Sequence, residues 1–239
     1  MDIQGNVAII TGGGSGIGSG VAKALAKQGV KVAICGRREE PLQRTIGEIE
    51  SDGGTAIAIP ADVSKQHQVA RLVEQTLDRF SQIDILVNNA GIGGSGAIDE
   101  HAVETWDEVM AVNLRGPFLT SRAVLPGMRE RESGHIINIS SESATTYYEG
   151  SGAYGVSKHA LNALSEYIQV ENQDKGIRVD TICPGMVVTE MTEDRPGLDH
   201  YKCLVPRDIA DLVLWLVTRR PNIKIGTPIL IQTMLNPWE

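Results

Sequence analysis

Seven short apolar runs, separated from one another by helical or turn-rich stretches, constrain the fold of this chain more than any other feature. The runs cover residues 6–11, 31–35, 55–61, 83–90, 134–140, 177–184 and 227–233. Several are almost continuous in Val, Ile and Ala, as expected for parallel strands that are buried on both faces. Strands that alternate with helices predict right-handed β-α-β crossovers. The chain is therefore expected to form an α/β, doubly wound parallel sheet of about seven strands with helices on both faces.

The stretches between the runs carry helical periodicity. Residues 65–80 place four apolar side chains on one helical face: Val69, Leu72, Val73 and Phe80. Near the end of the chain, Trp215 lies in an apolar helical stretch and is expected in the core. No linker, repeat or low-complexity tract interrupts the pattern. We therefore expect one domain over residues 1–239, with a short, less regular substrate-loop segment at about 189–205.

Composition excludes several classes of protein. A net charge of -8 argues against a nucleic-acid or anionic-membrane partner, and no apolar run reaches the 18 residues of a membrane span. The first residues lack a basic region followed by an apolar stretch, so no signal peptide is expected. Three cysteines without C-x-x-C spacing are typical of reduced thiols, which favours a cytoplasmic protein. The five histidines show no ligand spacing, so no metal site is expected.

A glycine-rich turn, TGGGSGIGSG at residues 11–20, follows the first apolar run and opens a helical stretch. Glycines at such a turn let the backbone approach a phosphate, and the helix N-terminus offers free N–H groups and a positive dipole end. The spacing is T-G-x-x-x-G-x-G, formed by Thr11, Gly12, Gly16 and Gly18, and not G-x-G-x-x-G. A phosphate-binding P-loop is excluded because no Gly-Lys-Ser/Thr follows. The alternative is a tight turn without a ligand.

Further motifs follow in order along nearly the whole chain: Asp62-Val63, the NNAG of residues 88–91, Asn113, Ser141, Y-x-x-x-K at Tyr154 and Lys158, Pro184-Gly185, and Thr189. Together with the glycine spacing, they resemble the short-chain dehydrogenase/reductase family. The resemblance implies a Rossmann-type fold. It also implies an NAD(P)-dependent oxidoreductase that interconverts a ketone or aldehyde and an alcohol by hydride transfer.

Four residues correspond to the family's catalytic set: Asn113, Ser141, Tyr154 and Lys158. Ser141 precedes Tyr154 by thirteen residues, the spacing typical of the family, and is preferred on that ground to its neighbour Ser140. Tyr154 and Lys158 are four apart, so they share one helix face, and a nearby ammonium lowers the pKa of a phenol. Tyr154 is expected to exchange a proton with the substrate oxygen, while Ser141 holds that oxygen. The resemblance implies that Lys158 also binds the nicotinamide ribose and that Asn113 positions a water.

Taken singly, some of these residues have simpler interpretations. Ser141 would be a strand-end or capping serine, and Asn113 an amide inside a helix. The resemblance and the turn together predict this cofactor-binding set: Gly12, Ser15, Gly16, Ile17, Gly18, Arg37, Arg38, Asp62, Val63, Asn89, Ala90, Gly91, Tyr154, Lys158, Pro184, Gly185, Val187 and Thr189.

The end of the second apolar run predicts the cofactor. NAD-preferring sites usually carry an acidic residue here, but this chain has Gly36 followed by Arg37 and Arg38. Guanidinium groups bind phosphate, so we expect preference for NADP(H), mainly through Arg37, with NAD(H) still possible. A solvated arginine pair neutralised by Glu39 and Glu40 is the alternative. Ser15 stands where some NADP-specific relatives carry a second basic residue.

Within the family, a 3-oxoacyl-type reductase is the first expectation, ahead of sugar or polyol dehydrogenases and steroid reductases. The partner would be a small-molecule carbonyl or alcohol substrate. A symmetric homo-oligomer, a dimer or a homotetramer, is also expected, because the helix that carries Tyr154 has a large apolar surface. The alternative from another class is a catalytically silent dinucleotide-sensing or scaffold protein. Two features depart from the family: the C-terminus lacks the usual Gly-Gly pair, and the segment at about 189–205 is short for a substrate lid.

Overall fold

The predicted apolar runs form one parallel seven-stranded sheet in the computed structural model, which describes residues 1–226 and 228–238. The strands are β1 Val7–Thr11, β2 Lys31–Gly36, β3 Ala56–Pro60, β4 Ile85–Asn88, β5 Gly134–Ile139, β6 Ile177–Pro184 and β7 Ile229–Ile231. Their order across the sheet is β3-β2-β1-β4-β5-β6-β7, and every neighbouring pair is parallel. The doubly wound α/β prediction is therefore confirmed. Thr227, the first residue of the last predicted run, lies outside the described residues.

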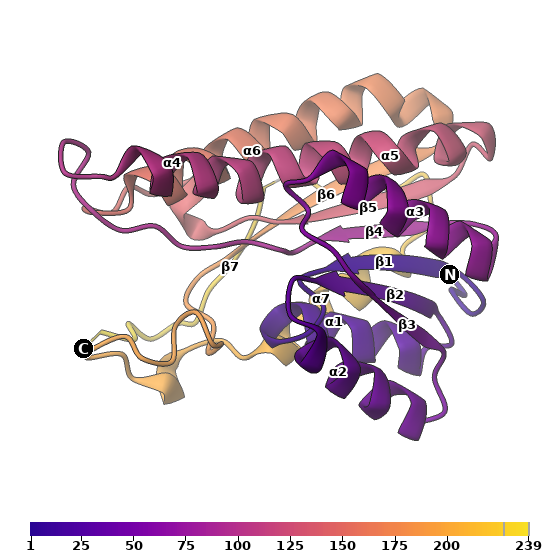
Figure 1. Ribbon diagram of the computed structural model, residues 1–239, viewed down its shortest axis with the longest axis horizontal. Coiled ribbons are helices and arrows are strands. Elements are labelled where there is room, and N and C mark those ends of the chain that lie inside the picture. Colours follow the sequence, from indigo (N-terminus) through magenta and orange to yellow (C-terminus); the bar gives the residue numbers. More distant parts are fainter. Residues whose placement is uncertain (227, 239) are drawn as a thin grey trace.

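Helices cover both faces of the sheet (Figure 1). On one face lie α1 Gly16–Lys27, α2 Glu39–Ser51 and α7 Pro206–Val217. On the other face lie α3 Gln66–Phe80, α4 Val103–Met110, α5 Gly116–Glu130 and α6 Gly152–Asn172. Short turns complete the chain: a π-helical turn at Ala111–Arg115 and 3₁₀ turns at Glu142–Ala144, Gln173–Lys175 and His200–Lys202.

Two apolar cores, one on each side of the sheet, hold these layers together. In α3, three of the four predicted apolar positions are buried, whereas Val73 is only half-buried and Thr76 takes a fully buried place on the same face. Thr76 tolerates this burial because its hydroxyl donates to the Leu72 carbonyl at 2.7 Å.

The expectation for Trp215 was wrong, because its side chain is 45% exposed. The core face of α7 is formed by Ile209, Val213 and Leu216, which follow helical spacing and leave Trp215 to one side. The Arg219 guanidinium lies over the Trp215 ring, 4.9 Å from its centroid. This contact covers part of the ring without removing it from water.

The order of the strands changes direction between β1 and β4, at whose carboxyl ends a ligand-binding crevice is expected. The chain leaves β1 toward β2 and β3 on one side, then returns to β4 on the other. Loops that leave such neighbouring strands in opposite directions open a crevice between them, which is where open α/β sheets bind ligands. Both the glycine-rich turn and the Asn-Asn-Ala-Gly motif follow these two strands.

The segment between β6 and α7 lies beside the C-terminal segment (Figure 1). Its residues form turns, bends and one 3₁₀ turn, and Val187 pairs with Leu204 in an isolated bridge. The Asp199 N–H donates to the Pro237 carbonyl at 2.8 Å, which ties the two segments together. Over the described ranges 1–226 and 228–238, no helix has the length and apolar character needed to span a membrane.

Candidate active site

A cleft of about 200 Å³ opens at the predicted crevice. Eight residues of the predicted cofactor set line it: Gly12, Ser15, Arg37, Arg38, Asp62, Val63, Ala90 and Gly91. Sequence reasoning did not select other lining residues, among them Pro41, Leu42, Ile92 and Val112. Ile92 follows the Asn-Asn-Ala-Gly motif and Val112 precedes Asn113, so proximity to these motifs was the available signal.

Close packing explains the glycines of the turn. A Cβ on Gly18 would lie 2.2 Å from the Gly12 carbonyl oxygen, and one on Gly12 would lie 2.8 Å from Asn89 Nδ2. Gly12 and Gly16 also have φ of +66° and +50°, a conformation that other residues rarely adopt. The turn therefore lies flat against the end of β4, where Asn89 Nδ2 donates to the Thr11 carbonyl at 2.9 Å.

The first turn of α1 faces the same cleft. Ser15 is its N-cap residue, but its side chain makes no capping hydrogen bond. The Ser15 hydroxyl instead donates to Glu190 Oε2 at 3.4 Å. The first N–H groups of α1 therefore have no side-chain cap, which is the arrangement that binds anions at helix N-termini.

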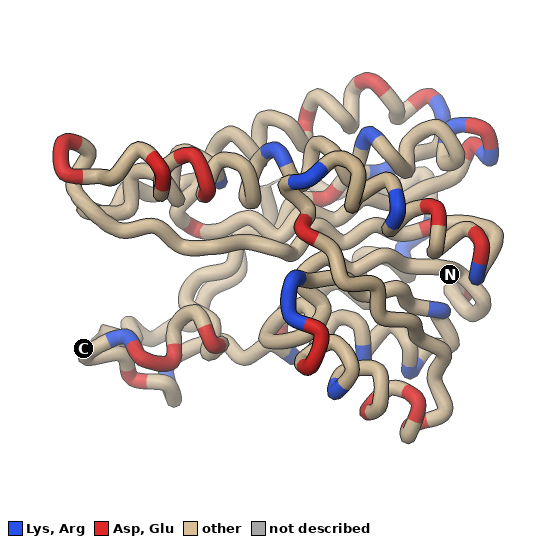
Figure 2. The backbone as a smooth tube through the Cα atoms, in the orientation of Figure 1, with Lys and Arg blue, Asp and Glu red and all other residues tan. Residues whose placement is uncertain are grey.

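Both candidate phosphate-binding arginines have carboxylate partners from distant elements. Arg37 lies 3.3 Å from Glu108 of α4, and Arg38 lies 2.5 Å from Glu190. In Figure 2, a blue segment and then a red one join β2 to α2. The red segment is Glu39 and Glu40: Glu40 pairs with Arg44, and among the described residues no ion pair joins Glu39 to either arginine. All four paired side chains are at least half exposed.

Asp62 forms the opposite wall of the cleft. Its carboxylate accepts hydrogen bonds from the Ser64 N–H at 2.9 Å and the Ser64 hydroxyl at 2.8 Å. Burial raises the pKa of Asp62, but these bonds and the positive charges of Lys65 and Arg37 outweigh it and hold the pKa below its ordinary value. Asp62 is therefore a charged acceptor at neutral pH.

Tyr154 and Lys158 lie together near the start of α6. Lys158 Nζ is 5.6 Å from the centroid of the Tyr154 ring and donates to the Ile139 carbonyl at 2.9 Å. Burial lowers the pKa of Lys158 to about 8. The lysine is thus a buried ammonium held by the end of β5, and it loses its proton more readily than a solvated lysine does.

The pKa of Tyr154 differs from the sequence-based expectation. Burial raises it above the ordinary value, and this effect exceeds the lowering by a hydrogen bond from Ser141 and by the positive charge of Arg195. The tyrosine is therefore protonated at neutral pH in this structure. That is the state required of a proton donor, whereas a proton acceptor needs further positive charge nearby.

The two adjacent serines have different surroundings. Ser140 directs its hydroxyl to the Lys158 carbonyl at 3.3 Å, inside the core. Ser141 is the N-cap of the 3₁₀ turn Glu142–Ala144, where its Oγ accepts from the Ser143 N–H at 3.1 Å. Its side chain also hydrogen-bonds to Tyr154. The geometry therefore places Ser141, and not Ser140, beside the tyrosine.

Asn113 lies in the π-helical turn Ala111–Arg115 and is fully buried. Its side chain forms a pair of hydrogen bonds with the Ile92 backbone, both 2.9 Å long, and its Nδ2 also donates to Ser157 Oγ at 3.1 Å. Such turns are frequent at functional sites. Through these hydrogen bonds of Asn113, the turn links the loop after β4 to α6. The amide lies close to the lysine, since a Cβ on Gly91 would be 3.4 Å from Asn113 Oδ1 and 3.6 Å from Lys158 Nζ.

The remaining predicted residues border the site without lining the cleft. Pro184 ends β6, and the Gly185 N–H donates to the Ile231 carbonyl at 2.8 Å. Thr189 packs on the glycine-rich turn, since a Cβ on Gly16 would lie 3.1 Å from its Cγ2. Asn89 braces the same turn, and Val187 pairs with Leu204. Ile17 and Gly18 belong to the first turn of α1.

Comparisons with known proteins agree with this arrangement. A family model described as short chain dehydrogenase matches residues 6–197. An uncharacterized oxidoreductase of Staphylococcus saprophyticus subsp. saprophyticus is 38% identical over 227 residues, which are 95% of this chain and 97% of the relative.

Solved structures are similar over almost the whole chain. A single-residue variant of actinorhodin polyketide ketoreductase, solved with NADPH, has a TM-score of 0.90 and 30% identity, covering 98% of this chain and 97% of that one. A metagenomic short-chain oxidoreductase in complex with NADP has a TM-score of 0.86 and 31% identity, covering 98% and 100%. The sheet order, the motifs and these matches lead to one conclusion: this chain belongs to the short-chain dehydrogenase/reductase family and is an oxidoreductase of Rossmann fold.

Proposed function

We propose that this protein is an NADP(H)-preferring reductase that interconverts a ketone or aldehyde and an alcohol, with Tyr154 as the proton donor. The observation that carries the proposal is the joint placement of Tyr154, Ser141 and Lys158 next to the cleft. Gly91 lines the cleft, and a Cβ on it would lie 3.6 Å from Lys158 Nζ. In reduction, the Tyr154 hydroxyl donates its proton to the carbonyl oxygen, and Ser141 donates a hydrogen bond to the same oxygen. The buried Lys158 ammonium then stabilises the phenolate that Tyr154 leaves behind.

Two features of the cleft support a nicotinamide dinucleotide as its ligand. Gly12, Gly16 and Gly18 form a turn that side chains would fill, and it leads into the uncapped N-terminus of α1. When bound there, the cofactor supplies the hydride. Asp62, ionised at the cleft wall, is placed to accept hydrogen bonds from the adenine end, and Lys158 to donate to ribose hydroxyls.

Preference for NADP(H) follows from the charge at the end of β2. Gly36, Arg37 and Arg38 line the cleft, and none carries a negative charge that would repel a 2′-phosphate. Exposed ion pairs contribute about 0–1 kcal/mol, so a phosphate would displace Glu108 and Glu190 from the arginines at little cost. The two structural neighbours described above were solved with NADPH and NADP, which supports the same choice.

A panel of carbonyl compounds tests the proposal against a silent sensor or scaffold. The purified protein would be mixed with NADPH or NADH and with ketones that include a 3-oxoacyl thioester, a cyclic diketone and a sugar ketone, while cofactor absorbance is followed. We expect turnover with at least one ketone. Tight cofactor binding without turnover of any member would instead favour the sensor.

The Gly18→Ala variant tests the glycine cradle. A methyl group 2.2 Å from the Gly12 oxygen forces the turn to move, so we expect NADPH affinity to fall at least about tenfold and stability to fall by about 1–3 kcal/mol. Gly47→Ala is the matched control, because Gly47 lies on α2 with open space around it. Helix propensity predicts that this control gains about 0.5–1 kcal/mol. NADPH titration and denaturant unfolding measure both; unchanged binding by Gly18→Ala would contradict the cradle.

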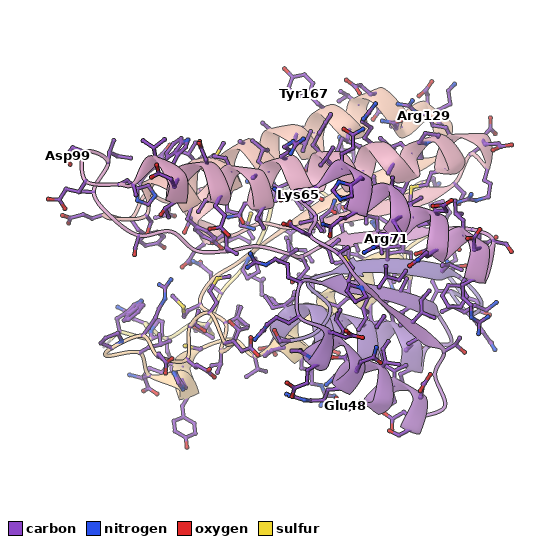
Figure 3. The ribbon with its side chains drawn as sticks, viewed as in Figure 1. Glu48, Lys65, Arg71, Asp99, Arg129 and Tyr167 are labelled. Carbon is purple, nitrogen blue, oxygen red and sulfur yellow. The ribbon has the colours of Figure 1, made fainter. Side chains whose placement is uncertain are left out.

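The outer faces of α5 and α6 support a homo-oligomer. Phe118 of α5 is 46% exposed, and on α6 Val156, Tyr167 and Val170 are 45%, 67% and 54% exposed. Tyr167 projects away from the sheet (Figure 3). Monomers rarely expose such contiguous apolar surface, so we propose that two copies bury it together, in a dimer or in a tetramer built from dimers.

Light scattering at micromolar concentration checks this prediction. We expect a mass of at least twice the 25.7 kDa of one chain, and a shift toward the monomer in Tyr167→Glu because a carboxylate would then be buried. Tyr201→Glu is the control, since Tyr201 is fully exposed on a separate 3₁₀ turn. A wild-type protein that scatters only as 25.7 kDa would refute the oligomer.

A further inference from the structure

Glu142 carries a carboxylate at the border of the proposed site. It follows Ser141 directly and begins the 3₁₀ turn Glu142–Ala144. Its Oε2 accepts a hydrogen bond from Gln232 Nε2 at 2.5 Å, and a Cβ on Gly185 would lie only 3.1 Å from the same oxygen. Tyr148 also hydrogen-bonds to this carboxylate. The carboxylate is therefore oriented over the backbone where β6 ends, in a half-exposed position.

The C-terminal segment, which departs from the family pattern, holds Glu142 in place. Ile231 of β7 pairs with Pro184 of β6, and the Ile231 carbonyl accepts the Gly185 N–H. This register sets Gln232, the next residue, against Glu142. The short last strand thus supplies one of the hydrogen bonds that orient the carboxylate.

The negative charge of Glu142 affects the pKa of the Tyr154 hydroxyl. Burial is the largest cause of the raised pKa of Tyr154, and the negative charge of Glu142 raises it further, as does Cys183. Ser141 and the exposed Arg195 act in the opposite direction, and Lys158 lies 5.6 Å from the ring. Among these groups Glu142 has the smallest effect on the pKa, so its nearness to the site rests on contacts. Glu142 follows Ser141, which hydrogen-bonds to Tyr154, and its Oε2 lies against Gly185 at the border of the site.

We propose that Glu142, oriented by Gln232, determines which substrates reach Tyr154. It accepts a hydrogen bond from a hydroxyl or ammonium group next to the reacting carbonyl and rejects substrates that carry a carboxylate there. An ionised carboxylate offers about four acceptor positions, of which Gln232 and Tyr148 use two. A carboxylate on the substrate would be repelled by the like charge of Glu142, whose side chain is half-buried. Specific sites exclude unwanted ligands by such like-charge repulsion. The proposal rests on the proposed reductase function.

Two matched sets of ketones test it, in which only the group beside the carbonyl changes. The small set is butanone, hydroxyacetone and pyruvate; the aromatic set is propiophenone, 2-hydroxyacetophenone and phenylglyoxylate. For each, kcat/KM with NADPH would be measured in wild type, Glu142→Gln and Glu130→Gln. The last is a charge-matched control at the exposed end of α5, where the chain leads to the amino end of β5, away from the site at the carboxyl ends of the strands.

We expect wild type to reduce the hydroxyketone best and the oxo acid least within a set. Glu142→Gln should raise the ratio of oxo acid to unsubstituted ketone about tenfold or more, because the like charge is gone. It should also lower the apparent pKa of the proton-transferring group in the pH profile of kcat/KM. A purely structural loss would reduce all rates together and leave that pKa in place. Glu130→Gln should match wild type in both measurements.

Equal ratios and an unmoved pH profile in Glu142→Gln would overturn the proposal. If no member of either set is reduced, the affinities of pyruvate and hydroxyacetone for the NADP⁺-loaded wild type and variant give the same comparison. Stronger pyruvate binding by Glu142→Gln than by wild type then supports the assignment, and equal binding refutes it. Failure of the reductase proposal itself would appear separately, as no turnover of any ketone in the wider panel.

Discussion

The Tyr154→Phe variant is expected to lose turnover by about 10²–10⁴-fold while it still binds cofactor. The change removes one hydroxyl, the group that a hydrogen bond from Ser141 reaches and that burial keeps protonated. The ring remains, so its contact with Lys158 Nζ and the packing of α6 are preserved. Because only proton transfer is lost, we expect kcat to fall far more than cofactor affinity. Initial-rate kinetics with the best ketone, together with NADPH titration, measure both.

Tyr147→Phe is the matched control for this variant. Tyr147 precedes α6 and is 87% exposed, and its ring stacks on the His159 ring with centroids 5.2 Å apart. Losing its hydroxyl leaves the stacked rings and the proposed site unchanged, so this control should keep wild-type rates. If Tyr154→Phe also retained most of its activity, Tyr154 would not be the proton donor.

Replacing both Arg37 and Arg38 by alanine is expected to weaken NADPH binding by about 10–100-fold and NADH binding much less. The reason is that the two cofactors differ only in the 2′-phosphate. These guanidinium groups line the cleft beside Gly36, the position where NAD-preferring sites usually carry an acidic residue. Raised salt should weaken NADPH binding by wild type in part, because the arginines are more than half exposed and therefore screened. Dissociation constants for both cofactors at two salt concentrations give the comparison.

Arg44→Ala controls for the loss of positive charge near α2. Arg44 pairs with Glu40 one helical turn away and is absent from the cleft lining, so its removal should leave the NADPH to NADH ratio unchanged. A wild-type enzyme whose kcat/KM favours NADH would show that the cofactor prediction is wrong, whatever the variants do.

The strands and the glycine turn were predictable because their signals are local. Continuous apolar runs report burial on both faces, and the spacing of Gly12, Gly16 and Gly18 reports a turn in which side chains do not fit. The choice of Ser141 over Ser140 rested on a spacing typical of the family, and the geometry sets Ser141 beside Tyr154.

Contacts between distant elements were not predictable in the same way. Glu108 and Glu190 reach the arginines from 71 and 152 residues away, and Gln232 reaches Glu142 from 90 residues away. Such pairs depend on strand order and on loop conformation, neither of which leaves a periodic trace in sequence. Trp215 was misplaced for a related reason, because an apolar helix such as α7 does not reveal from composition alone which of its faces meets the sheet.

Under the proposed function, this chain passes hydride from a nicotinamide cofactor to a carbonyl carbon. The most direct test supplies NADPH deuterated at C4 on the transferred face, together with the ketone that the panel selects, and analyses the alcohol by mass spectrometry. With wild type we expect one deuterium on the carbinol carbon, and with Tyr154→Phe at least about a hundredfold less product over the same time. Bound deuterated cofactor with no deuterium in any product would contradict it.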